Sequence, residues 1–230
     1  MSSYRSRGRR KQPPEPLPLD GSVSITSLRG CSDDPARVNL CVNRRLLGRI
    51  LIETMSDHGL SVGDAWTAEL DSSLSEELER GNAYRAGLRV LSKRAKSAML
   101  LERKLREFGY QRDAIDWSIN RLIEFGFLDD EKYAEMLVRS VLLGKPAGRR
   151  LLEGKLRQAG IEQGIITRVL DEMLEDRDPL DDARKLGARA ARSISERYEP
   201  EVRRRRIAGR LARRGFAYPV IRAVLEELKI

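Results

Sequence analysis

Apolar residues recur at helical spacing through the C-terminal two thirds of the chain. From about Leu70 onward they lie three or four residues apart, in segments that Gly and Pro separate. The earlier stretches VSITSLRG (23–30) and RVNLCV (37–42) instead alternate apolar and polar residues, and NRR (43–45) after them indicates a hairpin connection. ILIETMSDHG (50–59) predicts a short helix that ends at its final Gly. The pattern therefore predicts a mainly α protein with a small β-hairpin and helix unit before the helices.

The helical part contains an internal repeat of apolar and Gly positions. Five positions recur in three copies that are 51 and then 55 residues apart: Leu105, Gly109, Ile115, Ile119 and Leu122; Leu156, Gly160, Ile166, Leu170 and Met173; Leu211, Gly215, Ile221, Leu225 and Leu228. In each copy the Gly can take the left-handed conformation that ends a helix, and the next residue (Tyr110, Ile161, Phe216) can pack back on it. A second helix follows, and a further helix precedes each pair. Because such units contact mainly their neighbours, we expect an elongated tandem array of three three-helix repeats.

These features divide the chain into five segments. Residues 1–20 form a basic, Pro-rich tail that we expect to be disordered, and 21–70 form the β-hairpin and helix unit. The three helical repeats occupy 71–128, 129–176 and 177–230. The Arg and Ser content of the tail would also suit a transit peptide, but the tail lacks an amphipathic apolar face.

The distribution of charge adds a functional signal to this architecture. The chain has 44 Lys and Arg against 35 Asp and Glu, a net charge of +9, and a pI of about 9.8. The excess lies on the middle helix of each repeat, since residues 91–112, 145–157 and 201–214 carry net charges of +5, +4 and +6. The intervening helices are correspondingly acidic. Such segregation predicts a phosphate-rich or acidic partner.

The basic side chains of the middle helices point away from the predicted core. On a helical wheel, Ala98, Leu101, Leu105 and Phe108 share the apolar face of the first middle helix. Three such helices in register would form a basic stripe for a nucleic-acid backbone or for a protein filament wrapped on one, although a single basic helix is adequately explained as a solvated face. The candidate partner-binding residues are Lys96, Arg103, Lys104, Arg106, Arg149, Arg150, Lys155, Arg157, Arg203, Arg204, Arg205, Arg206, Arg210, Arg213 and Arg214.

Motifs of catalysis and of cofactor binding are missing from the sequence. There is no Gly-rich phosphate loop, no C-x-x-C pair and no H-E-x-x-H motif. His58 is the only histidine, which excludes multi-histidine metal sites and most catalytic triads, and its place beside Gly59 suits a helix C-terminus. Carboxylates at 129–131 and 181–182 could hold Mg²⁺, but at helix starts they act as caps. We therefore predict a protein that is not an enzyme and has no catalytic residues, cofactor or metal.

Cysteine and aromatic residues narrow the setting further. Cys31 and Cys41 are too few for a disulfide framework, and no secretory segment or membrane-spanning run is present, so we expect a cytoplasmic monomer. The larger aromatic residues are scattered rather than interleaved with basic ones, which argues against stacking of single-stranded bases. These aromatic residues are Trp66, Trp117, Tyr133 and Tyr198.

Three motifs in the helical part resemble those of the bacterial RecX proteins. The family pattern R-x-x-S at a helix start matches Arg94 and Ser97, and F-[IL]-[DN]-[DE]-x-x-[FY]-A matches residues 127–134. The longer pattern K-x-x-G-R-x-x-L-x-x-x-L-x-x-x-G-I matches residues 145–161. Residues 25–66 also resemble the hairpin and helix extension of longer RecX members.

The resemblance implies a partner that charge alone does not identify. RecX proteins are modulators of the RecA recombinase, without enzymatic activity, that lie in the groove of the RecA–DNA filament and restrain its ATPase and strand exchange. This implies a role in recombination, DNA repair and the SOS response, with the RecA filament as partner, single- or double-stranded DNA as a further one, and no membrane. From the residues alone, two alternatives stay open: a direct nucleic-acid binder with helix-turn-helix-like repeats, and an interaction scaffold that binds no nucleic acid.

Overall fold

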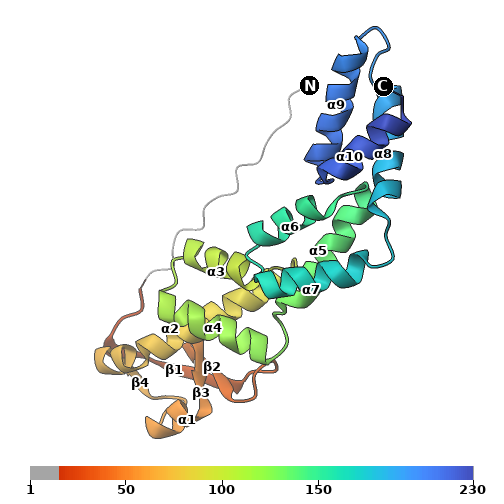
Figure 1. Ribbon diagram of the computed structural model, residues 1–230. Helices are drawn as coiled ribbons and strands as arrows, with labels where there is room; N and C mark the ends of the chain where they lie inside the picture. Colours follow the sequence, from red (N-terminus) through yellow and green to blue (C-terminus); the bar gives the residue numbers. More distant parts are fainter. Residues whose placement is uncertain (1–15, 230) are drawn as a thin grey trace, which may run out of the picture. The chain divides into compact units, whose positions relative to one another are not determined.

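The computed structural model describes residues 16–229, which belong to two compact units, Met1–Asn82 and Ala83–Ile230 (Figure 1). Most of the basic tail predicted for residues 1–20 lies outside the described residues. The described part is mainly helical with one small antiparallel sheet, as predicted. The division into five segments stays a prediction.

The first unit contains a four-stranded antiparallel sheet in the order β3-β2-β1-β4. Asn43 and Arg44 connect β2 to β3 with positive φ angles of 47° and 60°, the geometry of a type I′ turn, so the predicted hairpin is confirmed. The predicted short helix is also confirmed, with Gly59 at a φ of 59° after it. Trp66 and Ile25 are buried in the core of this unit. Its elements are β1 (Asp20–Gly30), β2 (Arg37–Val42), β3 (Arg45–Leu51), α1 (Ile52–Asp57) and β4 (Ala65–Thr67).

Two elements differ from the sequence prediction. The strand β4 was not predicted, because three residues are too few to show an alternating pattern, yet Asp20 pairs with Thr67 in the sheet. The helix predicted to precede the first helix pair is the last part of one 24-residue helix, α2 (Ala68–Leu91). Leu74 in the first part of α2 is buried in the core of the first unit.

The second unit consists of three three-helix repeats, which confirms the predicted architecture. Asp side chains cap two of its helices: Asp129 accepts from the N–H of Lys132, as the sequence predicted for the carboxylates at 129–131, and Asp178 accepts from the N–H of Leu180. The repeats are formed by the end of α2 with α3 (Ala98–Glu107) and α4 (Arg112–Glu124), by α5 (Asp130–Gly144), α6 (Arg149–Gln158) and α7 (Gln163–Leu174), and by α8 (Pro179–Ser193), α9 (Pro200–Arg213) and α10 (Tyr218–Glu227).

The turn after each middle helix follows the predicted glycine chemistry. Gly109, Gly160 and Gly215 have φ angles of 92°, 76° and 81°, which side chains other than Gly rarely adopt. Ile161 and Phe216 after them are buried, and Tyr110 packs partly buried against the core of the first repeat.

The predicted core position of Phe108 is wrong. Its side chain is 51% exposed. Phe108 lies on the apolar side of α3, but the first repeat has no preceding repeat to cover this end of the helix. At the corresponding position of the second repeat, Ala159 is only 5% exposed.

Candidate partner-binding surface

The three middle helices meet end to end at two joints. Ser97, the N-cap of α3, is buried, and its hydroxyl donates to the carbonyl of Ala159, the C-cap of α6, at 2.5 Å. Gly148, the N-cap of α6, donates its N–H to the carbonyl of Arg214, the C-cap of α9, at 2.8 Å. Each joint therefore brings the positive end of one helix dipole to the negative end of the next, a favourable arrangement. We call the connected helices α3, α6 and α9 the basic row.

Added side-chain atoms would not fit at either joint, and at the second joint the neighbouring atoms belong to the backbone. A Cβ on Gly148 would lie 2.7 Å from the backbone nitrogen of Phe216 and would overlap the carbonyl of Gly215. A Cβ on Gly160 would likewise overlap the side chain of Met99 at the first joint. Gly160 and Gly215, which the repeat pattern identified as helix stops, thus also lie at the contacts between repeats.

Two charged residues stabilise the joints. The guanidinium of Arg214 donates to the carbonyl of Pro146 at 2.8 Å and to the carbonyl of Lys145. Arg214 is one of the predicted partner-binding residues, and its role in binding stays a prediction beside these contacts within the molecule. At the first joint, the carboxylate of Asp130 accepts from the N–H of Ala98 at 2.8 Å, and burial raises the pKa of this carboxyl group.

The strongest concentration of positive charge lies on α9. Arg205, Arg206, Arg210 and Arg213 are exposed and, with Ile194 and Gly209, line a hollow of about 370 Å³ that has no acidic residue in its lining. We call this the α9 hollow. The guanidinium of Arg206 also lies 3.9 Å from the ring centroid of Tyr198.

The other two predicted arginines of this run are less accessible. Arg203 and Arg204 are half-buried, and the Nε of Arg203 is buried and has no hydrogen-bond partner among residues 16–229. We therefore expect the four arginines of the α9 hollow to contribute more to partner binding than Arg203 or Arg204.

Acidic neighbours partly neutralise the positive charge on α6. Arg149 forms ion pairs with Asp171 at 2.6 Å and with Glu153 at 3.0 Å, and these hydrogen bonds raise the pKa of Arg149. Arg157 lies 3.6 Å from the same Glu153. Arg150 and Lys155 are exposed, and among residues 16–229 neither forms an ion pair.

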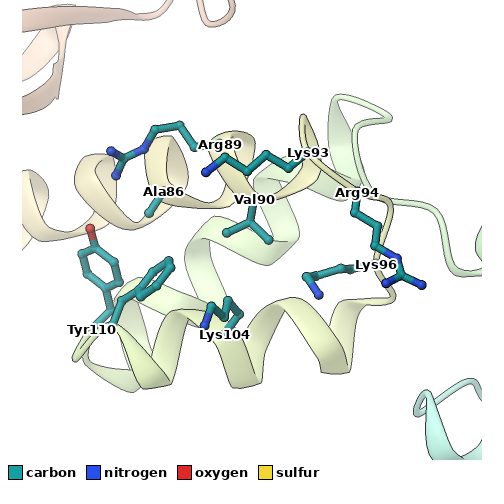
Figure 2. A pocket seen from close by; sticks show the side chains of 9 residues that line it. Ala86, Arg89, Val90, Lys93, Arg94, Lys96, Lys104 and Tyr110 are labelled. Atoms are coloured by element: carbon teal, nitrogen blue, oxygen red, sulfur yellow. The ribbon is translucent and has the colours of Figure 1, made fainter. Parts of the chain in front are cut away.

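On α3, acidic side chains pair with two of the four predicted cations. Arg106 pairs with Glu102, and Lys104 pairs with Glu107 at 2.7 Å, which lowers the pKa of Glu107. Arg103 is exposed and Lys96 half-buried. A further set of cations, from the end of α2 and the loop after it, was not predicted and shares a hollow with Lys96 and Lys104 (Figure 2). The high net charge of residues 91–112 was the signal that pointed to them.

His58 and the acidic residues were considered for metal binding because of their side-chain chemistry. Within residues 16–229, no group of three or more His, Cys, Asp or Glu is placed to hold a metal ion. His58 caps the end of α1, as predicted, with its Nδ1 3.0 Å from the carbonyl of Thr54. In the same part of the chain, no helix combines the length and apolar character needed to span a membrane.

Family models match all three repeats. Residues 83–122 match the first three-helix domain of RecX, 129–170 the second and 176–225 the third. The order of the three domains along this chain is that of the family.

Sequence relatives extend beyond single domains. The regulatory protein RecX of Trichlorobacter lovleyi is 35% identical over 147 residues, which cover 64% of this chain and 95% of the relative. That of Mycobacterium sp. (strain JLS) is 34% identical over 157 residues and covers 64% of this chain and 80% of its own length.

Solved structures share the fold. A crystal structure of a regulatory protein RecX aligns with a TM-score of 0.67 over 89% of this chain and 99% of its own, at 19% identity. RecX from Lactobacillus salivarius aligns with a TM-score of 0.57 over 66% of this chain and 97% of its own, at 26% identity. The resemblance found in the sequence motifs is thus confirmed, and the chain belongs to the RecX family of regulatory proteins.

Proposed function

We propose that this protein binds the RecA–DNA filament through its basic row and inhibits the ATPase and strand-exchange activities of RecA. A regulatory role follows from the family, and the choice of RecA as partner rests on the family resemblance. The protein acts by binding, as a cytoplasmic monomer without catalysis of its own, in recombination and DNA repair. The observation that carries the proposal is the pair of joints that connect α3, α6 and α9 end to end.

Connected basic helices suit a partner whose acidic features repeat. Residues 91–112, 145–157 and 201–214 each carry excess positive charge, and the joints hold their helices in fixed succession. Contacts at several helices act together, because binding at one raises the effective concentration at the next. A protein that binds one state of the filament more tightly than another shifts the filament toward that state. Inhibition follows when the preferred state is the one that does not exchange strands.

The α9 hollow supports a second candidate function, direct binding of DNA. Its four arginines have no acidic residue beside them in the lining, and such a cluster attracts any phosphate backbone. In this alternative, the protein would affect RecA only because it occupies the DNA.

One titration distinguishes the two functions. Inhibition of RecA ATPase on single-stranded DNA is measured beside direct binding to the same DNA at two salt concentrations. Filament binding predicts inhibition at protein concentrations well below those that occupy free DNA. Inhibition that follows free-DNA binding and its steep salt dependence would instead support the second candidate.

A matched pair of variants tests the surface. The test variant replaces Arg205, Arg206, Arg210 and Arg213 with Gln and should weaken inhibition while the helical content stays unchanged. The control removes four cations outside the basic row by replacing Arg112, Lys132, Arg139 and Lys185 with Gln. Each control residue belongs to an exposed ion pair, and such pairs contribute about 0 to 1 kcal/mol to stability. Equal loss of inhibition in both variants would show that only total charge matters and would contradict the proposed surface.

A further inference from the structure

A second basic hollow, of about 530 Å³, lies between the last turns of α2 and the helix α3 (Figure 2). Its volume falls within the range of small-ligand sites. Of the residues that the structure describes, no carboxylate lines this α2–α3 hollow and five cations do: Arg89, Lys93, Arg94, Lys96 and Lys104.

Most of this charge is uncompensated. Lys104 pairs with Glu107, but in the described part of the chain the other four cations form no ion pair. The helix dipole of α2 has its negative end near Arg89 and Lys93, so it stabilises their positive charges. It does not explain Lys96, which directly precedes the N-cap of α3, where the dipole disfavours a positive charge.

An exposed aromatic ring lies among these cations. Phe108 lines the hollow, is 51% exposed, and has the ammonium of Lys104 5.0 Å from its ring centroid. Ala159 and Arg214 occupy the position of Phe108 in the second and third repeats. At the joints their carbonyls accept hydrogen bonds from Ser97 and Gly148. Within residues 16–229 no such joint forms at the end of α3, and the Phe108 ring is exposed there.

We propose that the α2–α3 hollow binds a nucleotide of single-stranded nucleic acid, with its phosphate held by Arg89, Lys93 and Lys96 and its base stacked on Phe108. Cations account for the phosphate, and an exposed ring beside them accounts for an unpaired base, which a duplex does not present. An acidic peptide would use the cations but would leave the ring without a partner. This inference does not depend on RecA, and it differs from the expectation, drawn from the scattered Trp and Tyr residues, that stacking of single-stranded bases is disfavoured.

The test measures fluorescence anisotropy of labelled five-nucleotide oligothymidylate, without RecA. A chain that already carries the four Gln substitutions of the α9 hollow serves as the parent, so that binding there does not mask the result. Phe108→Ala should weaken binding to oligothymidylate by about 5- to 150-fold, the effect of losing one stacked base. It should leave binding to an abasic oligonucleotide of the same length unchanged. Phe108→Tyr should retain the affinity of the parent.

Lysine variants test the phosphate-binding role separately. Replacement of Lys93 and Lys96 with Gln should weaken binding to both oligonucleotides and lower the slope of log affinity against log salt by about 0.7 for each phosphate that is no longer neutralised. Replacement of Lys185 and Arg222 with Gln, which removes two exposed cations of the third repeat, serves as the control. Thermal unfolding confirms that each variant is folded.

Three results would overturn the inference. The first is unchanged oligothymidylate binding in Phe108→Ala, and the second is equal losses in the lysine variant and its control. The third is a polyglutamate peptide that binds the parent more tightly than oligothymidylate and is weakened by the lysine variant alone, which would identify the hollow as a peptide site.

Discussion

Gly148→Ala tests the joint between the second and third repeats. The added methyl group would overlap the carbonyl of Gly215 and lie 2.7 Å from the backbone nitrogen of Phe216, where 3.4 to 4 Å is ordinary contact. The two helices must separate by several tenths of an ångström or more. Overpacking of this kind costs about 1 to 3 kcal/mol. Loss of the bond from the Gly148 N–H to the Arg214 carbonyl would add about 1 kcal/mol.

We therefore expect Gly148→Ala to lower the free energy of unfolding by about 2 to 4 kcal/mol. Because repeats are stabilised largely by their interfaces with neighbours, the third repeat should also unfold separately from the others. Urea unfolding followed by circular dichroism should show a broader transition with a smaller m-value. RecA inhibition should weaken as well, because α9 is uncoupled from α6.

Gly154→Ala provides a matched control in the same helix. Gly154 is exposed, and a Cβ there meets nothing within 4 Å. In a helix interior, Ala is more favourable than Gly by about 1 kcal/mol. The same chemical change should thus stabilise the protein in the middle of α6 and destabilise it at the N-cap of this helix. A Gly148→Ala variant that unfolds at the wild-type urea midpoint with the wild-type m-value would refute the close joint.

Three further changes test the core and the first joint, each by urea unfolding. Leu156→Ala removes a fully buried side chain of the second repeat and should cost about 2 to 5 kcal/mol; a cost below about 1 kcal/mol would contradict its core role. Ser97→Ala removes the N-cap of α3 and the donor to the Ala159 carbonyl, and it should lower the free energy of unfolding by about 1 to 3 kcal/mol. Ser97→Gly should lower it less, because Gly is tolerated at an N-cap. The pKa of Asp130 is raised because burial disfavours its carboxylate, so ionisation of this group destabilises the folded state as the pH rises through the raised pKa. The free energy of unfolding of Asp130→Asn, relative to that of the wild type, should therefore be higher at pH 7 than at pH 3. The opposite order would show that the hydrogen bond to the Ala98 N–H stabilises the carboxylate more than burial destabilises it.

The repeat could be predicted from the sequence because its causes are local. Leu156, Gly160 and Ile166 have the spacing of a helix, a stop and a second helix, and the same causes act in the other two copies. Helix starts were predictable for the same reason, since an Asp cap acts on a backbone N–H only two or three residues away.

The joints could not be predicted because their partners are distant in sequence and differ in residue type. Ser97 and Ala159 lie 62 residues apart, and the second joint has Gly148 in the place of Ser97. Nothing local to Arg214 distinguishes it from the exposed arginines before it. Its role depends on the carbonyls of a preceding repeat.

The exposure of Phe108 could not be predicted from a helical wheel. The wheel places a residue on the apolar side of its helix but does not show whether another element covers that side. Ala159 is covered because a repeat precedes it, and Phe108 is exposed because none does. The candidate site of the first repeat, including Arg89, follows from this exposed end.

The most direct test of the central claim is an electron-microscopy structure of the protein bound to a RecA filament on single-stranded DNA. We predict that α3, α6 and α9 all face the filament and that Arg205, Arg206, Arg210 and Arg213 lie at the interface. An interface formed by α4, α7 and α10, with the basic row facing solvent, would contradict the account.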